Sequence, residues 1–404
     1  MNAAWTSTTI GDQATLQRGF DITRRQFIPG CTPVISSGGV IGYHSEAKSG
    51  GPGVVLGRKG TLGTVFYVEG EYWPHDTTLW VKDFHGNWPR YVYYFFKTLD
   101  AIRLDVGSAN PTLNRNHVHP IAAPWAPLRE QQAIAHVLGT LDDKIELNRR
   151  MNETLEEMAR AIFKSWFVDF DPVKAKMDGR KPYGMDDETA ALFPDSFEDS
   201  EIGRISKGWS VHNLDGIAEF LNGLALQKYP AEGPEALPVV KIAELRNGIS
   251  PKSGRASTDV PERYVVADGD LLFSWSGSLL AKLWSGGPGA LNQHLFKVTS
   301  ASHPRWFCYQ WVLRHLPEFQ RIAADKATTM GHIQRRHLAE AKTVSPPGPV
   351  LDGLGATIAP LIDRVVHNSL ESRTLGSLRD ALLPKLISGE LDVRELTDLP
   401  IETA

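Results

Sequence analysis

Long apolar runs, cysteines and a leader-like start are all scarce in this chain of 404 residues. Apolar residues make up 42% of it, but no run of about 18 of them occurs, which excludes an ordinary membrane-spanning helix. Its only two cysteines, Cys31 and Cys308, cannot form a disulfide framework, and residues 1–19 lack a basic start followed by an apolar stretch. We therefore expect a soluble, cytoplasmic protein of two or three domains.

Motifs for catalysis and metal binding are also missing. The chain has no Gly-x-x-x-x-Gly-Lys-Ser/Thr loop for nucleotide phosphates, and the glycines of Gly57–Gly63 have the spacing of turn residues. His117 and His119 lie close together in sequence, and so do His332 and His337. Neither pair has cysteines or a glutamate at zinc spacing. The sequence therefore favours a binding protein over an enzyme, with no metal site.

Charge alternates along the chain. The net charge is −4, which by itself argues against nucleic-acid binding. By segment, however, residues 1–126 carry +2 and residues 201–345 carry +4, whereas residues 127–200 and 346–404 carry −6 and −4. Such differences are small enough to be ordinary fluctuation, so other features must decide.

The second half of the chain repeats the first. A shift of 220 residues aligns positions 111–173 with 331–393 without a gap and gives ten identities in 63 pairs. Arg115 and His117 fall on Arg335 and His337. A repeat of this length indicates that one structural unit occurs twice.

The aligned segments each carry a heptad pattern, which predicts two long helices of about 40 residues, roughly 60 Å each. We expect a bend in the second at Pro360. The first seam consists of Ile134, Leu138, Leu141, Ile145, Asn148, Asn152, Leu155, Ala159, Ile162 and Trp166. The second consists of Leu354, Ile358, Leu361, Val365, Asn368, Ser372, Leu375, Arg379, Leu382 and Leu386.

Two narrow apolar seams in one chain predict an antiparallel coiled coil with pseudo-two-fold symmetry. Asn148 and Asn368 occupy the same repeat position, and a buried polar pair can fix the register of such a helix pair. The alternative is that these asparagines lie at a wet edge of the seam.

The segments before each helix are rich in short β-branched and aromatic runs, and they also correspond between the halves. The predicted fold class is α+β, with two mixed, β-rich domains and two long helices. We expect a helix near Tyr91–Leu99 and another near Trp306–Leu316. The predicted boundaries are a first domain at 1–126, a helical spacer at 127–170, a surface linker at 171–208, a second domain at 209–345, a second spacer at 346–392 and a tail at 393–404.

Several strings then make the chain resemble a known family, the specificity subunits of type I restriction-modification enzymes. They are Phe163–Val173 (FKSWFVDFDPV), Gly184–Asp186 (GMD), Leu192–Phe197 (LFPDSF), Gly208-Trp209 and Leu382–Leu391 (LLPKLISGEL). The resemblance implies two target-recognition domains, each binding one half of a split DNA site, and two helices that set the spacing.

The resemblance also implies partners and cofactors. The helices would bind two modification (methyltransferase) subunits, which carry S-adenosylmethionine, and a restriction (motor-nuclease) subunit using ATP and Mg would join them, in a bacterium or archaeon. This chain would bind no cofactor and be non-catalytic. In agreement, Asp171-Pro172-Val173 lacks the second proline and the aromatic residue of the methyltransferase motif.

Basic and amide side chains in turns or just after strands are the candidate DNA contacts, because arginine can pair with guanine and amides with adenine. They are Arg24, Arg25, Arg58, Lys59, Asn114, Arg115, Lys228, Lys241, Arg246, Gln293, His294, Gln334, Arg335 and Arg336. The alternative for each is an ordinary solvated surface residue, and the recurrence of arginine at 115 and 335 is also compatible with a structural ion pair.

Two other functions stay open at this stage. One is a single-chain nuclease or methyltransferase fused to its own recognition domains, although two domains and two helices leave little room for a catalytic domain. The other is a pseudo-dimeric DNA-binding regulator. The DNA sequence that would be recognised does not follow from the residues.

Overall fold

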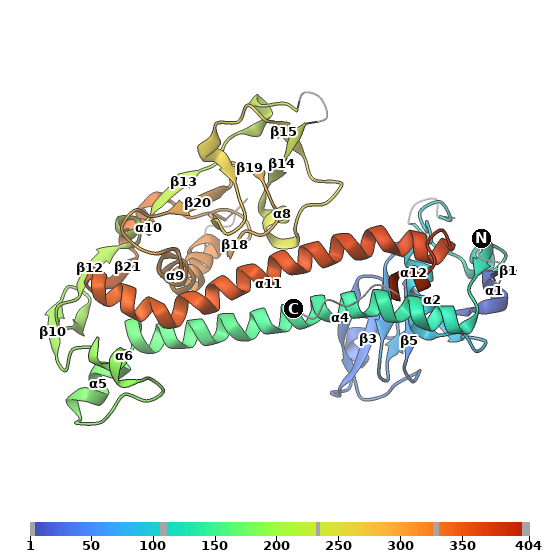
Figure 1. Cartoon of the computed structure of the whole chain (residues 1–404), viewed down its shortest axis with the longest axis horizontal. Coiled ribbons are helices and arrows are strands. Elements are labelled where there is room, and N and C mark those ends of the chain that lie inside the picture. The colour runs from blue at the N-terminus through green and yellow to red at the C-terminus, as the bar shows by residue number, and fades with distance from the viewer. Residues whose placement is uncertain (1–4, 106–110, 232–234, 326–330, 398–404) are drawn as a thin grey trace. The chain divides into compact units, whose positions relative to one another are not determined.

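The computed structural model describes residues 5–105, 111–231, 235–325 and 331–397 (Figure 1). The chain divides into two compact units, which are described separately. Unit 1 comprises Met1–Ile145 and Leu375–Ala404, and unit 2 comprises Glu146–Thr374. Both contain β-sheets and a portion of each of two long helices, so the predicted α+β class is confirmed.

The two long helices begin in the same way. Helix α4 (Leu128–Phe163) follows Pro127, and α11 (Gly348–Ser388) follows Pro347, and in each case the proline carbonyl accepts a hydrogen bond from the first turn. A π-helical turn, η2 (Lys164–Val168), extends α4. Pro360 lies inside α11 without ending it. Every seam position predicted from the heptad pattern is buried or half-buried, as expected for a helix pair.

The polar contacts of unit 2 establish that α4 and α11 are antiparallel. Asn148 Nδ2 donates to Ser372 Oγ (3.3 Å), whereas Asn152, one turn later, pairs with Asn368, one turn earlier (2.9 Å). Asn148 and Asn368 are 0% exposed, so these residues do not lie at a wet edge. The two contacts are exchanged by the 220-residue repeat, as the predicted pseudo-two-fold symmetry requires.

Unit 1 contains a four-stranded sheet, which packs against α2 (Pro89–Lys97), and a three-stranded sheet. The first sheet has the order β2 (Thr15–Arg18), β8 (Thr78–Asp83), β5 (Gly53–Gly57) and β6 (Val65–Val68), and the second has the order β4 (Gly39–His44), β3 (Thr32–Ser36) and β7 (Trp73–Pro74). The other elements are β1 (Thr6–Thr9) paired with β9 (Ala122–Trp125), α1 (Ile10–Gln13), η1 (Arg24–Gln26), α3 (Arg115–Val118) and α12 (Arg394–Thr397).

Unit 2 repeats this arrangement. Its sheets have the orders β13 (Glu219–Asn222), β20 (Leu295–Thr299), β17 (Leu271–Ser274), β18 (Ala281–Leu283) and β15 (Arg255–Ser257), β14 (Ala236–Val240), β19 (Gly289–Leu291), β16 (Val265–Val266). The other elements are β12 (Ser210–Asn213) paired with β21 (Lys342–Ser345), α7 (Leu214–Ile217), η3 (Leu226–Lys228), α8 (Ile242–Asn247), η4 (Glu262–Tyr264), α9 (Arg305–Asp325) and α10 (Arg335–Glu340).

The predicted duplication is therefore visible in strand order and direction. β3 pairs with β7 in parallel, and so does β14 with β19. The helix expected near Tyr91–Leu99 is α2, and the one expected near Trp306–Leu316 is α9, which continues to Asp325 with Pro317 inside it. The extension buries Phe319, which is 1% exposed.

A recurring ion pair attaches each domain to its long helix. In unit 1, Arg90 on α2 donates to Asp143 on α4 (3.0 Å). In unit 2, Arg305 on α9 donates to Asp363 on α11 (2.7 Å). Asp143 and Asp363 are one of the ten identical pairs of the repeat, which gives this identity a physical reason.

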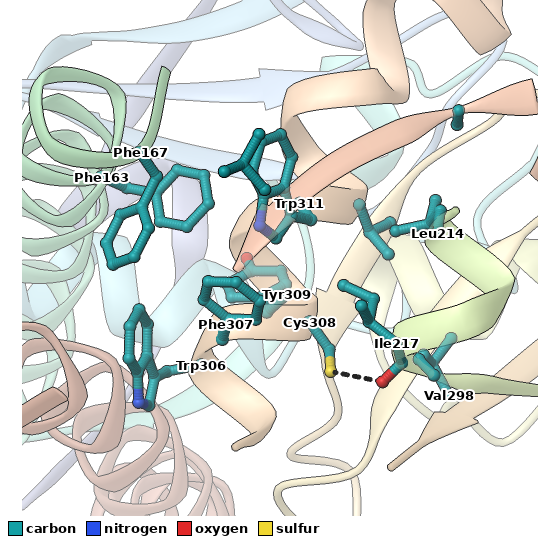
Figure 2. Close-up of a cluster of buried hydrophobic side chains, with 14 of the residues drawn as sticks. Phe163, Phe167, Leu214, Ile217, Val298, Trp306, Phe307, Cys308, Tyr309 and Trp311 are labelled. Atoms are coloured by element: carbon teal, nitrogen blue, oxygen red, sulfur yellow. Dashed lines mark hydrogen bonds between the residues drawn. The ribbon is translucent and has the colours of Figure 1, made fainter. Parts of the chain in front are cut away.

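Aromatic residues dominate the core of unit 2. Figure 2 shows Phe163 and Phe167 facing Phe307 and Trp311, with Phe163 and Phe167 stacked at 4.9 Å between ring centroids. In the same cluster the Cys308 thiol donates to the Ile217 carbonyl, and burial raises the pKa of Cys308 to about 11. None of the helices within the described ranges has the length and apolarity needed to cross a membrane.

Residues 171–208 differ from the expected surface linker. They form α5 (Asp171–Met177), α6 (Asp187–Ala191) and a hairpin of β10 (Phe197–Ser200) with β11 (Gly203–Ser206). Val173, Phe193 and Ile205 are at most 3% exposed and belong to the core of unit 2. The apolar side chains spread through this acidic, turn-rich stretch are sufficient to fold it onto that core.

Candidate nucleic-acid interface

Three loops of unit 1 meet at one end of β5 and β8, the two central strands of its larger sheet. The Arg58 N–H donates to the Thr77 carbonyl (2.9 Å), and the Arg58 carbonyl accepts from the Leu113 N–H (2.9 Å). The Gly60 N–H donates to the Pro111 carbonyl (3.3 Å), with Gly60 at φ +77°, a conformation that favours glycine. We call this meeting point of residues 58–60, 75–77 and 111–116 the unit 1 loop junction.

Unit 2 has the same backbone arrangement, the unit 2 loop junction, formed by residues 275–277, 292–294 and 331–336. The Trp275 N–H donates to the His294 carbonyl (3.4 Å), and its carbonyl accepts from the Ile333 N–H (2.9 Å). The Gly277 N–H donates to the Gly331 carbonyl (2.8 Å), again with positive φ at the glycine. One scaffold therefore presents two different sets of side chains.

At the unit 1 loop junction, three predicted contacts come together. Arg58, Asn114 and Arg115 line a hollow of about 750 Å³. The Asn114 Oδ1 caps α3 by accepting from the Asn116 N–H (3.0 Å), so its NH₂ group is the part left for a ligand. Arg58 Nη1 donates to the Asp76 carbonyl (3.4 Å). Lys59 is exposed, and its backbone forms an isolated antiparallel β-bridge with Thr112.

At the unit 2 loop junction, Gln293 and His294 lie together beside Trp275. The His294 Nδ1 is 3.0 Å from Ser276 Oγ, and its Nε2 is 3.4 Å from Gln293 Nε2. Trp275 Nε1 donates to Asn222 Oδ1 (2.9 Å) and to the Gln293 carbonyl (3.1 Å). This junction therefore presents the indole of Trp275 and the imidazole of His294, whereas the unit 1 loop junction presents the guanidinium of Arg58.

The recurring arginines differ in their contacts. Arg335 Nη2 donates to the Phe220 carbonyl (3.1 Å), and the guanidinium lies 5.7 Å from the centre of the Phe296 ring. Arg335 thus helps to hold α10 against its sheet. Arg115 is exposed and has no carboxylate partner among the described residues. The equivalent positions have therefore diverged in role.

The other predicted contacts are exposed but scattered. Gln334 caps α10, with its N–H donating to His337 Nδ1 (3.0 Å), and Arg336 follows on the same helix. Arg246 at the end of α8 lines a second hollow with Gly277. The remaining residues lie on other elements: Arg24 and Arg25 on η1, Lys228 at the end of η3, and Lys241 at the N-terminus of α8.

Sequence reasoning missed several junction residues. Arg18 at the end of β2 lines the unit 1 hollow and pairs with Asp21 (3.0 Å) and Asp76 (3.2 Å). Trp275 is also absent from the DNA contacts predicted from the sequence. The signal that would have found it is the alignment of Gly57–Gly60 with Ser274–Gly277, an offset of 217 residues that places Trp275 at the position of Arg58.

Positive charge lies next to the unit 1 hollow. Burial, and then the charge of Arg115, lower the pKa of His119 from its ordinary value of 6.5. The neutral ring is also required by geometry, since His119 Nε2 accepts the Leu16 N–H at 3.0 Å. Within the described ranges no group of three or more His, Cys, Asp or Glu side chains is placed to hold a metal ion.

Comparison with known proteins first assigns the class. Residues 2–157 match the family model described as the type I restriction modification DNA specificity domain. This part of the chain is therefore similar to that family of specificity domains. The matched segment covers the domain of unit 1 and most of α4.

Individual relatives extend the match over most of the chain. It is 29% identical over 326 residues to the type I restriction enzyme MjaIX specificity subunit of Methanocaldococcus jannaschii, covering 76% of this chain and 70% of the relative. It is 24% identical over 308 residues to the HindI specificity subunit of Haemophilus influenzae, covering 65% and 67%. The predicted resemblance to specificity subunits of type I restriction-modification enzymes is confirmed.

A solved structure shows the same fold. The crystal structure of the type I restriction-modification system S subunit from M. genitalium superposes with a TM-score of 0.56 at 14% sequence identity. The match covers 96% of this chain and 97% of that one. The fold described for both units is therefore the fold of an S subunit.

Proposed function

We propose that this chain is the DNA sequence-recognition subunit of a type I restriction-modification complex, with each β-rich domain binding one half of a bipartite site. The observation that carries the proposal is the pair of loop junctions, in which the same backbone scaffold holds different polar and aromatic side chains. Sequence-specific recognition needs such side chains to reach base edges. Two different sets suit two different half-sites.

The long helices support the second part of the proposal, that they set the distance between half-sites. At 1.5 Å per residue, the 36 residues of α4 span about 54 Å and the 41 residues of α11 about 61 Å. Half-sites one helical turn apart on DNA are separated by about 34 Å. The helices are thus long enough to act as a spacer.

The acidic charge of the helical segments suits protein partners better than DNA, since DNA repels carboxylates. We propose that two methyltransferase subunits bind here and supply S-adenosylmethionine chemistry, and that a motor-nuclease subunit with ATP and Mg performs cleavage. In this proposal the specificity chain performs no catalytic step and binds no cofactor itself. The predicted cytoplasmic location follows from the same role.

The test is to express the full chain with its methyltransferase partner and to map methylated bases in host DNA, using the partner without this chain as the control. The expected result is a two-part motif that depends on the chain. Absence of a motif would contradict the proposal. Tight, sequence-specific DNA binding by the purified chain alone, with no motif in the presence of the partner, would favour a stand-alone regulator.

A further inference from the structure

We propose that Arg58 and Arg115, in the hollow of the unit 1 loop junction, recognise a guanine in one half-site, and that unit 2, which has Trp275 at the position of Arg58, lacks this pair of guanidinium groups. The proposal rests on the function proposed above, because it concerns how that function is divided between the two domains. It names the specificity-determining residues of one half-site and the base that they bind.

The guanidinium groups of the hollow differ in whether a carboxylate already pairs with them. Of the three arginines lining the hollow, Arg18 is already paired with the carboxylates of Asp21 and Asp76. Arg58 and Arg115 have no carboxylate partner among the described residues. A hollow that holds two guanidinium groups without carboxylate partners is suited to a ligand with hydrogen-bond acceptors.

The Arg58 guanidinium is also held in a defined orientation. Arg58 is half-buried and held through Nη1 by the Asp76 carbonyl (3.4 Å), on a loop whose backbone is fixed from both sides by Thr77 and Leu113. A guanidinium fixed in this way loses little conformational entropy on binding. The guanidinium fork matches the adjacent O6 and N7 acceptors of guanine, the most frequent specific arginine contact in DNA.

The unit 2 loop junction differs from the unit 1 loop junction at the two equivalent positions. The position of Arg58 is occupied by Trp275, whose indole N–H already donates to Asn222 and to the Gln293 carbonyl. The position of Arg115 is occupied by Arg335, which donates to the Phe220 carbonyl. The scaffold is the same, but an indole replaces the guanidinium at the position of Arg58, so the unit 2 loop junction lacks the pair of guanidinium groups and must recognise its half-site by other groups.

The experiment uses the full chain with its methyltransferase partner and compares wild type with Arg58→Ala, Arg58→Lys and Arg115→Ala. Methylated bases are mapped, and affinity is measured on duplexes in which 7-deazaguanine, which lacks the N7 acceptor, replaces each motif guanine in turn. Arg103→Ala is the matched control, because Arg103 is an exposed arginine of the same domain outside the hollow.

We expect Arg58→Ala to reduce discrimination at one guanine of one half-site by roughly tenfold to a hundredfold, with the other half-site unchanged. Wild type should lose affinity when that guanine is replaced by 7-deazaguanine, whereas Arg58→Ala should not. Arg58→Lys keeps the charge without the fork and should not restore discrimination. Arg103→Ala should keep the wild-type motif.

The proposal is overturned if both Arg58→Ala and Arg115→Ala keep the wild-type motif. It is also overturned if they weaken binding equally on all sequences with a shallower salt dependence, which is the behaviour of a phosphate contact. Unchanged melting temperatures of the variants exclude misfolding as the cause. These outcomes differ from failure of the proposed function, in which wild type itself gives no two-part motif.

Discussion

Replacing the buried asparagines of the helix pair by leucine should stabilise unit 2 and weaken its register. Asn148 Oδ1 and Asn368 Oδ1 are buried without a hydrogen-bond partner among the described residues. Each such orphan acceptor costs about 1–3 kcal/mol, whereas each neutral hydrogen bond given up contributes about 0.5–1.5 kcal/mol and the bond from Asn148 Nδ2 to the Glu371 carboxylate (2.8 Å) about 1.5–3 kcal/mol. Leucine has the same number and branching of side-chain heavy atoms as asparagine, is larger in volume, and adds apolar burial.

The double variant Asn148→Leu/Asn368→Leu should therefore gain about 2 kcal/mol, which raises the melting temperature by about 4–8 °C for a domain of this size. Asn152→Ala is the opposing variant. It removes the acceptor of Asn368 Nδ2 (2.9 Å) and leaves that amide buried and unpaired, at a cost of about 1–3 kcal/mol. Differential scanning calorimetry of the full chain measures both.

The register effect is measured separately. If the asparagines select one alignment of the helices, the double-leucine variant should methylate sites with more than one spacer length, because an all-apolar seam tolerates slippage. A double-leucine variant that melts below wild type would refute the reasoning, since the amides would then stabilise the pair. A single, unchanged spacer would refute the role in register.

Three further changes test the fold. His315 has its pKa lowered by burial, so stability should fall as pH drops below 6.5, and His315→Gln should reduce this dependence in melting scans, whereas exposed His136→Gln should not; equal slopes would contradict it. Phe167→Ala, at a fully buried site, should cost about 3–5 kcal/mol in urea unfolding, and an unchanged midpoint would exclude its place in the core. A double-mutant cycle on Arg305 and Asp363 should give about 0.2–1 kcal/mol, and zero coupling would remove the pair as an attachment.

The long helices could be predicted from sequence because their signal is local. Alternating steps of three and four residues place Leu138 on the apolar face of α4 and Leu354 on the apolar face of α11, and both are 0% exposed. The short apolar run Val54–Leu56 is also a local signal, and it forms part of β5. Antiparallel pairing required only that two such seams occur in one chain.

The loop junctions could not be assembled from sequence because their contacts are long-range. The Arg58 carbonyl meets Leu113, and neither residue carries a motif that indicates the other. Side-chain identity has also diverged between Arg58 and Trp275, so a search for recurring arginines selected Arg335, which is a structural contact. What recurs is the backbone arrangement with its positive-φ glycine, and this becomes visible only in three dimensions.

Residues 171–208 and the end of α9 show how tertiary packing overrides local signals. Acidic and turn residues indicated a linker, but Phe193 finds a place in a core built from distant segments. A proline at 317 indicated the end of a helix, yet α9 continues because Phe319 is buried beyond it. In each case the apolar residue is local and its partners are not.

Insertion of one heptad into each long helix is the sharpest test of the proposal that the helix pair sets the distance between the two DNA-binding domains. Adding seven residues to both α4 and α11 lengthens each by about 10.5 Å, or about three base pairs of DNA at 3.4 Å each. Seven residues inserted after the fully exposed Tyr183 serve as the control. Methylation mapping should show a spacer about three base pairs longer with both half-sites unchanged. An active variant that still recognises the original spacer would contradict the role of the helix pair in setting that distance.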